Sequence, residues 1–435
     1  MHPNALLEAC TELVRLTLKF DHPADAVVSK FFRDYRKTYA FGPRERATLA
    51  ETTYNVLRNK LRYDHLAPSG SGPKERRLAI LGLADHLQNR HARPSNKPLD
   101  FLLGALNKQE TAWLEACTKV QTSDLLDRHR HNLPEWLVEP LKAQVGDGFW
   151  PLVAQLSASA PLDLRVNTFT DKREDVQKEL KAAGIQATPT PFSPWGLRIE
   201  GKPALSQLDL FTRGAVEVQD EGSQLLALLL DAKRGEMVCD FCAGAGGKTL
   251  AIGASMRSTG RLYAFDTSAH RLEALKPRLA RSKLSNVHPA AIAHERDDRI
   301  KRLSGKMDRV LVDAPCSGLG TLRRNPDLKW RQSPQSVAEL TAKQTAILAS
   351  AARLLKSGGR LVYATCSLLP QENEAIAQAF SAAHPEFTPL SVSETLQALK
   401  VTDAASLSSH DGLYLRLWPH LHASDGFFAA AWTAK

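Results

Sequence analysis

Hydrophobic positions in the first third of the chain recur at helical spacing. Leu6, Cys10 and Leu13 lie three and four residues apart, and a second run of this kind extends from Leu49 to Leu61. Clusters of glycine and proline separate such runs. The pattern therefore predicts an all-helical domain over residues 1–130.

Farther along, shorter apolar stretches replace the helical pattern. Residues 161–167 and 196–199 are typical of strands, and a helical pattern over 173–183 lies between them. We therefore expect a small α/β module over residues 131–212.

From Gly214 onward, strand patterns alternate with helical ones, which is typical of a doubly wound parallel sheet. Two final strand-like runs, 413–418 and 427–432, predict an antiparallel hairpin. The expected fold class is thus α/β, with a Rossmann-like sheet over residues 213–435. The expected strands are Met237–Phe241, Arg261–Asp266, His288–Ala293, Arg309–Asp313 and Gly359–Ala364, and the helices are Lys248–Met256, Ala269–Ser282 and Ser336–Leu355.

Composition limits the class of protein. The chain has 435 residues, of which 43% are hydrophobic, enough for two or three packed domains. Six cysteines are too few for a disulfide-stapled secreted fold, and the longest apolar run, Leu225–Leu230, is too short to span a membrane. Without a signal-peptide pattern, a cytoplasmic protein with free thiols and no membrane partner is expected.

The net charge of +10 fits an anionic partner such as nucleic acid, although many basic proteins bind none. The first domain carries a cluster of basic residues that predicts either an RNA-binding face or an ordinary solvated surface. The cluster comprises Arg33, Arg36, Lys37, Arg44, Arg46, Arg58, Lys60 and Arg62.

A glycine-rich turn, Asp240–Thr249, follows the first expected strand of the large sheet. It is not a phosphate-binding Walker loop, because Cys242 stands where that motif needs glycine, and Thr249 breaks the dinucleotide fingerprint. The next strand ends in Asp266, an acid placed to bind ribose hydroxyls or, alternatively, to cap a helix. These features favour S-adenosylmethionine as cofactor.

Two cysteines follow apolar strands in short motifs, Cys316 in Asp313–Gly318 and Cys366 in Tyr363–Ser367. Strand ends of a parallel sheet meet at its ligand-binding edge, so a thiolate there can act as a nucleophile. The alternative is that both are small buried residues. Residue types alone allow either cysteine to attack.

A metal site is not expected. Cys239 and Cys242 have redox or half-zinc spacing, but no second pair accompanies them, and they lie on a strand and turn.

The motifs Asp240–Thr249, Asp313–Gly318 and Tyr363–Ser367 resemble those of the NSUN (Nol/Nop/Sun) family of RNA cytosine-5 methyltransferases. The helical part resembles the NusB-type domain of the bacterial Sun branch, which modifies small-subunit ribosomal RNA. One departure is Ala245, where the family usually has proline. Secondary motifs of the family are matched at residues 133–137, 165–167, 218–223, 323–330, 419–420 and 425–428.

This resemblance implies that Cys366 attacks C6 of the cytosine and that Cys316 helps to break down the adduct. It also implies that Asp313 contacts the base and that Lys248 lies near loop and target. The implied cofactor residues are Cys242, Ala243, Gly244, Ala245, Gly246, Gly247, Lys248, Asp266, Arg271, Asp297 and Asp313. Asp297 is chosen over Glu295 and Asp298 as the acid that faces adenosine.

The expected function is therefore transfer of a methyl group from S-adenosylmethionine to cytosine C5 in ribosomal RNA by a monomer. An adenine methyltransferase is disfavoured, because Asp313–Cys316 lacks the second proline and the aromatic residue of that motif. Two alternatives stay open: a non-catalytic RNA-binding assembly factor, and methylation of another RNA such as tRNA.

Overall fold

The computed structural model describes residues 1–35, 41–90, 99–201 and 203–435. It divides into two compact units, one formed by Met1–Ala158 with Leu322–Ser333 and the other by Ser159–Thr321 with Pro334–Lys435. Among the described residues, no helix is long and apolar enough to cross a membrane.

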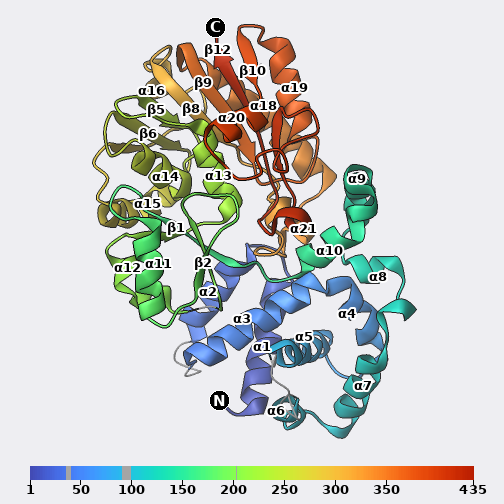
Figure 1. Ribbon diagram of the computed structural model, residues 1–435. Helices are drawn as coiled ribbons and strands as arrows, with labels where there is room; N and C mark the ends of the chain where they lie inside the picture. Colours follow the sequence, from blue (N-terminus) through green and yellow to red (C-terminus); the bar gives the residue numbers. More distant parts are fainter. Residues whose placement is uncertain (36–40, 91–98, 202) are drawn as a thin grey trace. The chain divides into compact units, whose positions relative to one another are not determined.

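The first unit is helical, as the sequence predicts (Figure 1). Its centre consists of three helices that contact one another, α1, α3 and α5. Leu7, Leu13, Leu49 and Leu78 are fully buried there, which explains the helical spacing of the apolar positions. The helices are α1 (Pro3–Thr17), α2 (Ala24–Asp34), α3 (Pro43–Arg58), α4 (Lys60–Leu66), α5 (Lys74–Arg90), α6 (Asp100–Leu103), α7 (Lys108–Lys119), α8 (Asp127–His131), α9 (Glu135–Val145), α10 (Phe149–Ser157) and α17 (Leu328–Arg331).

The segment Leu322–Ser333 comes from far along the chain, yet it packs in this helical unit. Lys329 Nζ donates to the Arg58 carbonyl at 2.9 Å, and Trp330 Nε1 donates to the Leu57 carbonyl at 2.8 Å. Arg58 in turn donates through Nη2 to the carbonyl of Arg323 at 3.1 Å. Arg58 is only 5% exposed, so its assignment to a basic surface was wrong. Arg36 and Lys37 of the same cluster lie outside the described residues.

The second unit begins with a small antiparallel sheet in the strand order β2-β3-β1-β4. The predicted strands and helix are present, and β4 follows residue 212, where the module was expected to end. The predicted loop around Pro189 also contributes a short strand, β2. The elements are β1 (Leu162–Val166), α11 (Arg173–Ala182), β2 (Ala187–Pro189), β3 (Gly196–Ile199), α12 (Asp209–Thr212) and β4 (Val216–Val218).

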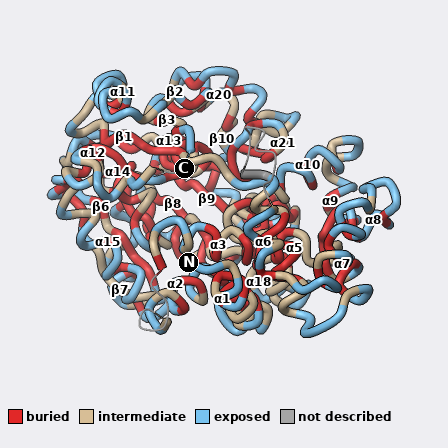
Figure 2. The backbone as a smooth tube through the Cα atoms, turned by 90° about the horizontal axis from the view of Figure 1, so that it is seen from below, coloured by how far each residue is buried: buried red, intermediate tan, exposed pale blue. Residues whose placement is uncertain are grey.

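The large sheet has the order β10-β12-β9-β8-β5-β6-β7, with β11 also paired to β12. The five adjacent strands β9, β8, β5, β6 and β7 pair in parallel with one another. Strand β12 pairs antiparallel with β9, β10 and β11. This arrangement confirms the predicted fold class. Its strands are largely buried (Figure 2). They are β5 (Met237–Asp240), β6 (Arg261–Asp266), β7 (Val287–Ala291), β8 (Met307–Asp313), β9 (Leu355–Thr365), β10 (Phe387–Leu390), β11 (Tyr414–Leu417) and β12 (Phe427–Ala434).

Helices flank this sheet and connect its strands (Figure 1). They are α13 (Glu221–Leu230), α14 (Gly247–Ser255), α15 (Ala269–Ser282), α16 (Asp298–Lys301), α18 (Pro334–Ala352), α19 (Glu374–Ala383), α20 (Val392–Ala398) and α21 (Pro419–His422).

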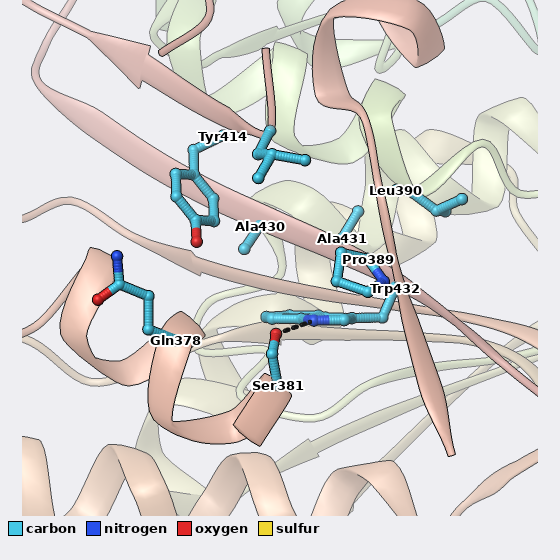
Figure 3. A pocket seen from close by; sticks show the side chains of 9 residues that line it. Gln378, Ser381, Pro389, Leu390, Tyr414, Ala430, Ala431 and Trp432 are labelled. Carbon is cyan, nitrogen blue, oxygen red and sulfur yellow. Dashed lines mark hydrogen bonds between the residues drawn. The ribbon is translucent and has the colours of Figure 1, made fainter. Parts of the chain in front are cut away.

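A cavity of about 250 Å³ lies where β11 and β10 share the outer edge of β12 (Figure 3). Tyr414 and Leu390 line it from these two strands, and Trp432 from β12 donates through Nε1 to Ser381 Oγ at 2.9 Å. Gln378 and Ser381 add to its lining from the segment between β9 and β10.

Candidate active site

The site forms at the carboxyl ends of β5, β8 and β9, which are neighbours in the sheet. The chain builds β6 and β7 on one side of β5 and then returns to β8 on the other side. Such a reversal leaves a crevice at the strand ends, where ligands of open α/β sheets bind. Asp240, Asp313 and Thr365 end these three strands, so the glycine loop and both cysteine motifs begin at one edge.

The backbone of the glycine loop adopts a conformation that residues other than glycine would strain. Gly244 and Gly246 have φ angles of +55° and +83°, and a Cβ on Gly246 would lie 2.2 Å from Leu275. Asp266 accepts from Gly244 N–H at 2.8 Å and from Ser268 N–H at 2.7 Å. Asp266 thus fixes the loop and caps the following turn, and its carboxylate keeps further lone pairs for a ligand.

The buried Asp240 beneath this loop fits a cationic ligand group. One carboxylate oxygen accepts from Thr249 Oγ1 at 2.7 Å, while Oδ1 is buried with no hydrogen-bond partner among the described residues. Burial raises the pKa of Asp240 to about 7. A positively charged group such as the amino group of S-adenosylmethionine would restore the ionised form, so these residues fit the predicted cofactor.

The two motif cysteines meet, with their Sγ atoms 3.4 Å apart. Both are partly exposed and free of disulfides. The hydrogen bond with Cys366 raises the pKa of the Cys316 thiol, and burial and the negative charges of Cys366 and Glu372 raise it further. The raised pKa favours the protonated form of the Cys316 thiol.

A partly buried ion pair interacts with Cys366. Lys248 Nζ donates to Asp313 Oδ2 at 2.7 Å and stands 5.9 Å from the ring centre of Phe427. Burial alone would lower the pKa of the Lys248 ammonium, but the charge and hydrogen bond of Asp313 outweigh it and raise the pKa, and negative charge on Cys366 contributes. Lys248 is thus a cation that interacts electrostatically with Cys366.

The acids after β7 have local roles in the structure. Asp297 caps the start of α16 and accepts from the N–H groups of Ala293 and Arg299, each at 2.9 Å. These hydrogen bonds lower its pKa. Asp298 pairs with Lys301, and Glu295 lies 3.7 Å from Arg296. The choice of Asp297 as the acid that faces adenosine stays a prediction. The role of Arg271, which is exposed in the first turn of α15, also stays a prediction.

Sequence reasoning missed Glu372, which is fully buried and contacts both cysteine motifs through Ser317 and Ser367. Its position just before α19 resembles that of an ordinary acid near a helix start, so spacing gave no signal. Within the described residues, no group of three or more His, Cys, Asp or Glu side chains could hold a metal ion.

The sheet order and the cofactor loop together define an S-adenosylmethionine-dependent methyltransferase with a Rossmann-like fold. Residues 227–433 match the family described as 16S rRNA methyltransferase RsmB/F, and residues 133–206 match the ferredoxin-like domain of RsmF/B-like methyltransferases. A probable ribosomal RNA small subunit methyltransferase B from Synechocystis is 33% identical over 419 residues, which cover 90% of this chain and 92% of that protein. The chain therefore belongs to the RsmB/F family of 16S rRNA methyltransferases, and the resemblance to Sun-type enzymes is confirmed.

Solved structures agree with the fold. The crystal structure of PH0851 matches with a TM-score of 0.75 and 26% identity, covering 100% of this chain and 99% of that one. The structure of NSun6 from Pyrococcus horikoshii with SFG matches with a TM-score of 0.59 and 21% identity, covering 69% of this chain and 98% of that one. The latter supports the fold alone.

Proposed function

We propose that this rRNA methyltransferase transfers a methyl group to C5 of a cytosine in 16S rRNA through a covalent adduct with Cys366. The observation that supports this most directly is the pair of thiols, 3.4 Å apart, beside the ion pair of Lys248 and Asp313. Two thiols at one pyrimidine allow one to attack while the other assists release.

Cytosine C5 is a weak nucleophile, and the proposed first step makes it stronger. The Cys366 thiolate adds to C6, and the displaced electron pair makes C5 enamine-like. Lys248 stabilises the thiolate before attack, and Asp313 positions the base and holds the Lys248 ammonium. S-adenosylmethionine, when bound, supplies the electrophilic methyl group, so that a C5–methyl bond forms.

Release of the product breaks the bond between the Cys366 sulfur and C6. Removal of the C5 proton returns its electron pair to the C5–C6 bond and expels the Cys366 thiolate. Cys316, hydrogen-bonded to Cys366, is assigned to this step: its thiol gives its proton to the departing Cys366 sulfur, and the Cys316 thiolate so formed accepts the C5 proton.

The cofactor is proposed to bind along the glycine loop, with Asp266 on the ribose hydroxyls and Asp240 beneath the loop. Asp266→Ala should weaken binding of S-adenosylmethionine by about 1–3 kcal/mol, the usual cost of a lost hydrogen bond to a charged group. Calorimetry on the folded variant measures this. Unchanged affinity would remove Asp266 from the cofactor site.

The chain is proposed to work in three parts. Residues 1–130, of NusB type, and residues 131–212 supply RNA affinity, and residues 213–435 supply the chemistry in a monomeric protein. Because 16S rRNA is the substrate of the family, the reaction is assigned to the cytoplasm.

The proposed function is tested with tritiated S-adenosylmethionine and unmodified 16S rRNA, both as naked transcript and in reconstituted small subunits. Methyl transfer is expected, and bisulfite sequencing should map it to a cytosine. Binding of this RNA without methyl transfer would favour a non-catalytic assembly factor, and transfer to a tRNA transcript alone would favour the other alternative.

A further inference from the structure

A buried carboxylate joins the two cysteine motifs from beneath. Glu372, 0% exposed, accepts through Oε1 from Ser317 N–H at 2.8 Å and through Oε2 from Ser317 Oγ at 2.6 Å. Oε2 also accepts from Ser367 Oγ. Ser317 directly follows Cys316, and Ser367 directly follows Cys366, so one side chain holds the neighbour of each thiol.

Glu372 is itself held in place. The Tyr363 hydroxyl donates to the Glu372 carbonyl at 2.7 Å, which fixes its backbone against β9. Gln344 on α18 donates through Nε2 to Glu372 Oε1 at 3.0 Å and to the Pro315 carbonyl at 2.9 Å. The carboxylate therefore lies within a network that reaches the residue before Cys316 as well as the residue after it.

We propose that Glu372 is a positioning residue that sets the distance and orientation of Cys316 relative to Cys366 by joining the Ser317 and Ser367 turns. The catalytic consequence rests on the proposed function, because two thiols must then serve one base. The effect of Glu372 on the distance and orientation of the two thiols does not depend on the proposed function.

Charge supports the same role. The Glu372 carboxylate is one of the groups that raise the pKa of Cys316, whereas the cation of Lys248 interacts with Cys366. Glu372 thus favours the proton on Cys316 in addition to holding the turn.

Other bonds also join the two loops. Gly320 N–H donates to the Cys366 carbonyl at 2.8 Å. The Ser317 and Ser367 hydroxyls lie 3.1 Å apart, so they can hydrogen-bond to each other once Glu372 no longer accepts their protons. The loops therefore remain connected without Glu372, and its removal should change the thiol geometry more than the overall fold.

The test captures the thiol pair as a disulfide. Diamide accepts the two electrons and two protons released by Cys316 and Cys366, and mass spectrometry of the linked peptides gives the rate. Because close placement governs such rates, Glu372→Ala should slow capture about tenfold, and Glu372→Gln should slow it less. The amide still accepts from Ser317 N–H and can donate to a hydroxyl. Glu386→Gln, at an exposed glutamate, is the control and should match the wild type.

Turnover supplies a second readout. Glu372→Ala should lower kcat about 100-fold, as expected for misplaced reacting groups, while calorimetric affinity for S-adenosylmethionine stays within about twofold. Glu372→Gln should restore part of kcat. Wild-type capture rates in Glu372→Ala would overturn the proposal, as would cofactor affinity falling in parallel with the thermal midpoint.

Two safeguards keep the result interpretable. If Glu372→Ala does not fold, the double variant Ser317→Ala and Ser367→Ala removes the two hydroxyl bonds and should slow capture as well; capture at the wild-type rate would overturn the proposal. If wild-type protein methylates no RNA, the proposed function fails, yet the capture rates still decide the role of Glu372.

Discussion

The loop after β9 and the loop after β8 each carry one cysteine, but they are built differently. The β9 loop is local: Thr365 Oγ1 donates to Asn373 Oδ1 at 2.5 Å, Asn373 Nδ2 donates to the Ser367 carbonyl at 3.0 Å, and the chain then enters α19. The β8 loop instead continues through Leu319–Thr321 into Leu322–Ser333, a segment that packs in the helical unit, before α18 begins.

This difference separates the two proposed roles. The Cys366 loop is closed mainly by the contacts of Thr365 and Ser367 with Asn373, a few residues away, which suits a nucleophile whose attack needs a fixed geometry. Cys316 depends on contacts to distant parts of the sequence, because Gly320 beyond it contacts Cys366 and Gly426, and the following segment contacts α3. Cys316, the proposed helper, is therefore the thiol whose loop continues into a segment of the helical unit.

The largest expected effect distinguishes the two thiols. Cys366→Ala should lower turnover about 10⁴-fold or more, the scale seen when a nucleophile is removed, and should form no covalent complex. Cys316→Ala should still attack, so an enzyme–RNA adduct stable on denaturing gels should accumulate when S-adenosylmethionine is present. Cys117→Ala, in the helical unit, is the control. An adduct in Cys366→Ala and none in Cys316→Ala would reverse the roles.

The pH dependence of stability tests how the segment Leu322–Ser333, which continues the β8 loop, packs in the helical unit. Burial, followed by the charge of Arg58, lowers the pKa of Lys329 to about 7. Between about pH 7 and 10 the unfolded chain binds this proton and the folded chain does not, so the free energy of unfolding should rise with pH by at most about 1.4 kcal/mol per unit. Lys329→Met should remove this rise in the free energy of unfolding. Urea denaturation followed by tryptophan fluorescence at several pH values measures it.

The control for Lys329 is Lys30→Met, at an exposed helical lysine. It should leave the slope unchanged. Equal slopes in wild type and Lys329→Met would show that Lys329 is not held neutral by the packing of this segment.

A steric change tests the contact between the two loops. A Cβ on Gly320 would lie 2.1 Å from the Gly426 carbonyl oxygen and 2.8 Å from that of Cys366. Gly320→Ala should therefore cost about 1–3 kcal/mol in the free energy of unfolding, measured by chemical denaturation. Gly104→Ala, where the nearest atom is 3.6 Å from the added Cβ, should be tolerated. Equal stability of both variants would mean that the loops can separate freely.

The smallest expected effect concerns the unit to which the β8 loop is connected. Arg33 and Arg44 are exposed on its surface. If they contact RNA phosphates, replacing each with alanine should reduce the salt slope of log Kd by about 0.7–0.9. Filter binding over a range of salt concentrations measures it, with Arg234→Ala in the other unit as control. An unchanged slope would leave these arginines as solvated surface.

The sequence predicted much of the large sheet, because apolar strands such as Arg261–Asp266 end directly in polar motifs. Strand β10 was missed because Phe387–Leu390 contains Pro389, which is atypical of a strand but tolerated at this edge position. The assignment of Arg58 to a surface failed because its burial depends on Leu322–Ser333, more than 260 residues away.

The cysteines and glycine loop could be named from short motifs, but their contacts could not. That Cys316 and Cys366 meet depends on β8 and β9 pairing in parallel register, with Asp313 opposite Ala364. The role of Glu372 depends on a turn that brings its carboxylate back beneath residues 317 and 367. Such contacts leave no periodic trace in the sequence.

The placement of β12 has a consequence for how the protein is made. β12 pairs with β9 along Phe428–Thr433, and Gly426 just before it donates to the Gly320 carbonyl at 2.9 Å. During synthesis the ribosome produces β9 and its cysteine long before β12, so one edge of β9 remains without its final partner in the nascent chain. The thiol loops of an rRNA methyltransferase therefore reach their working arrangement only after the ribosome has delivered β12.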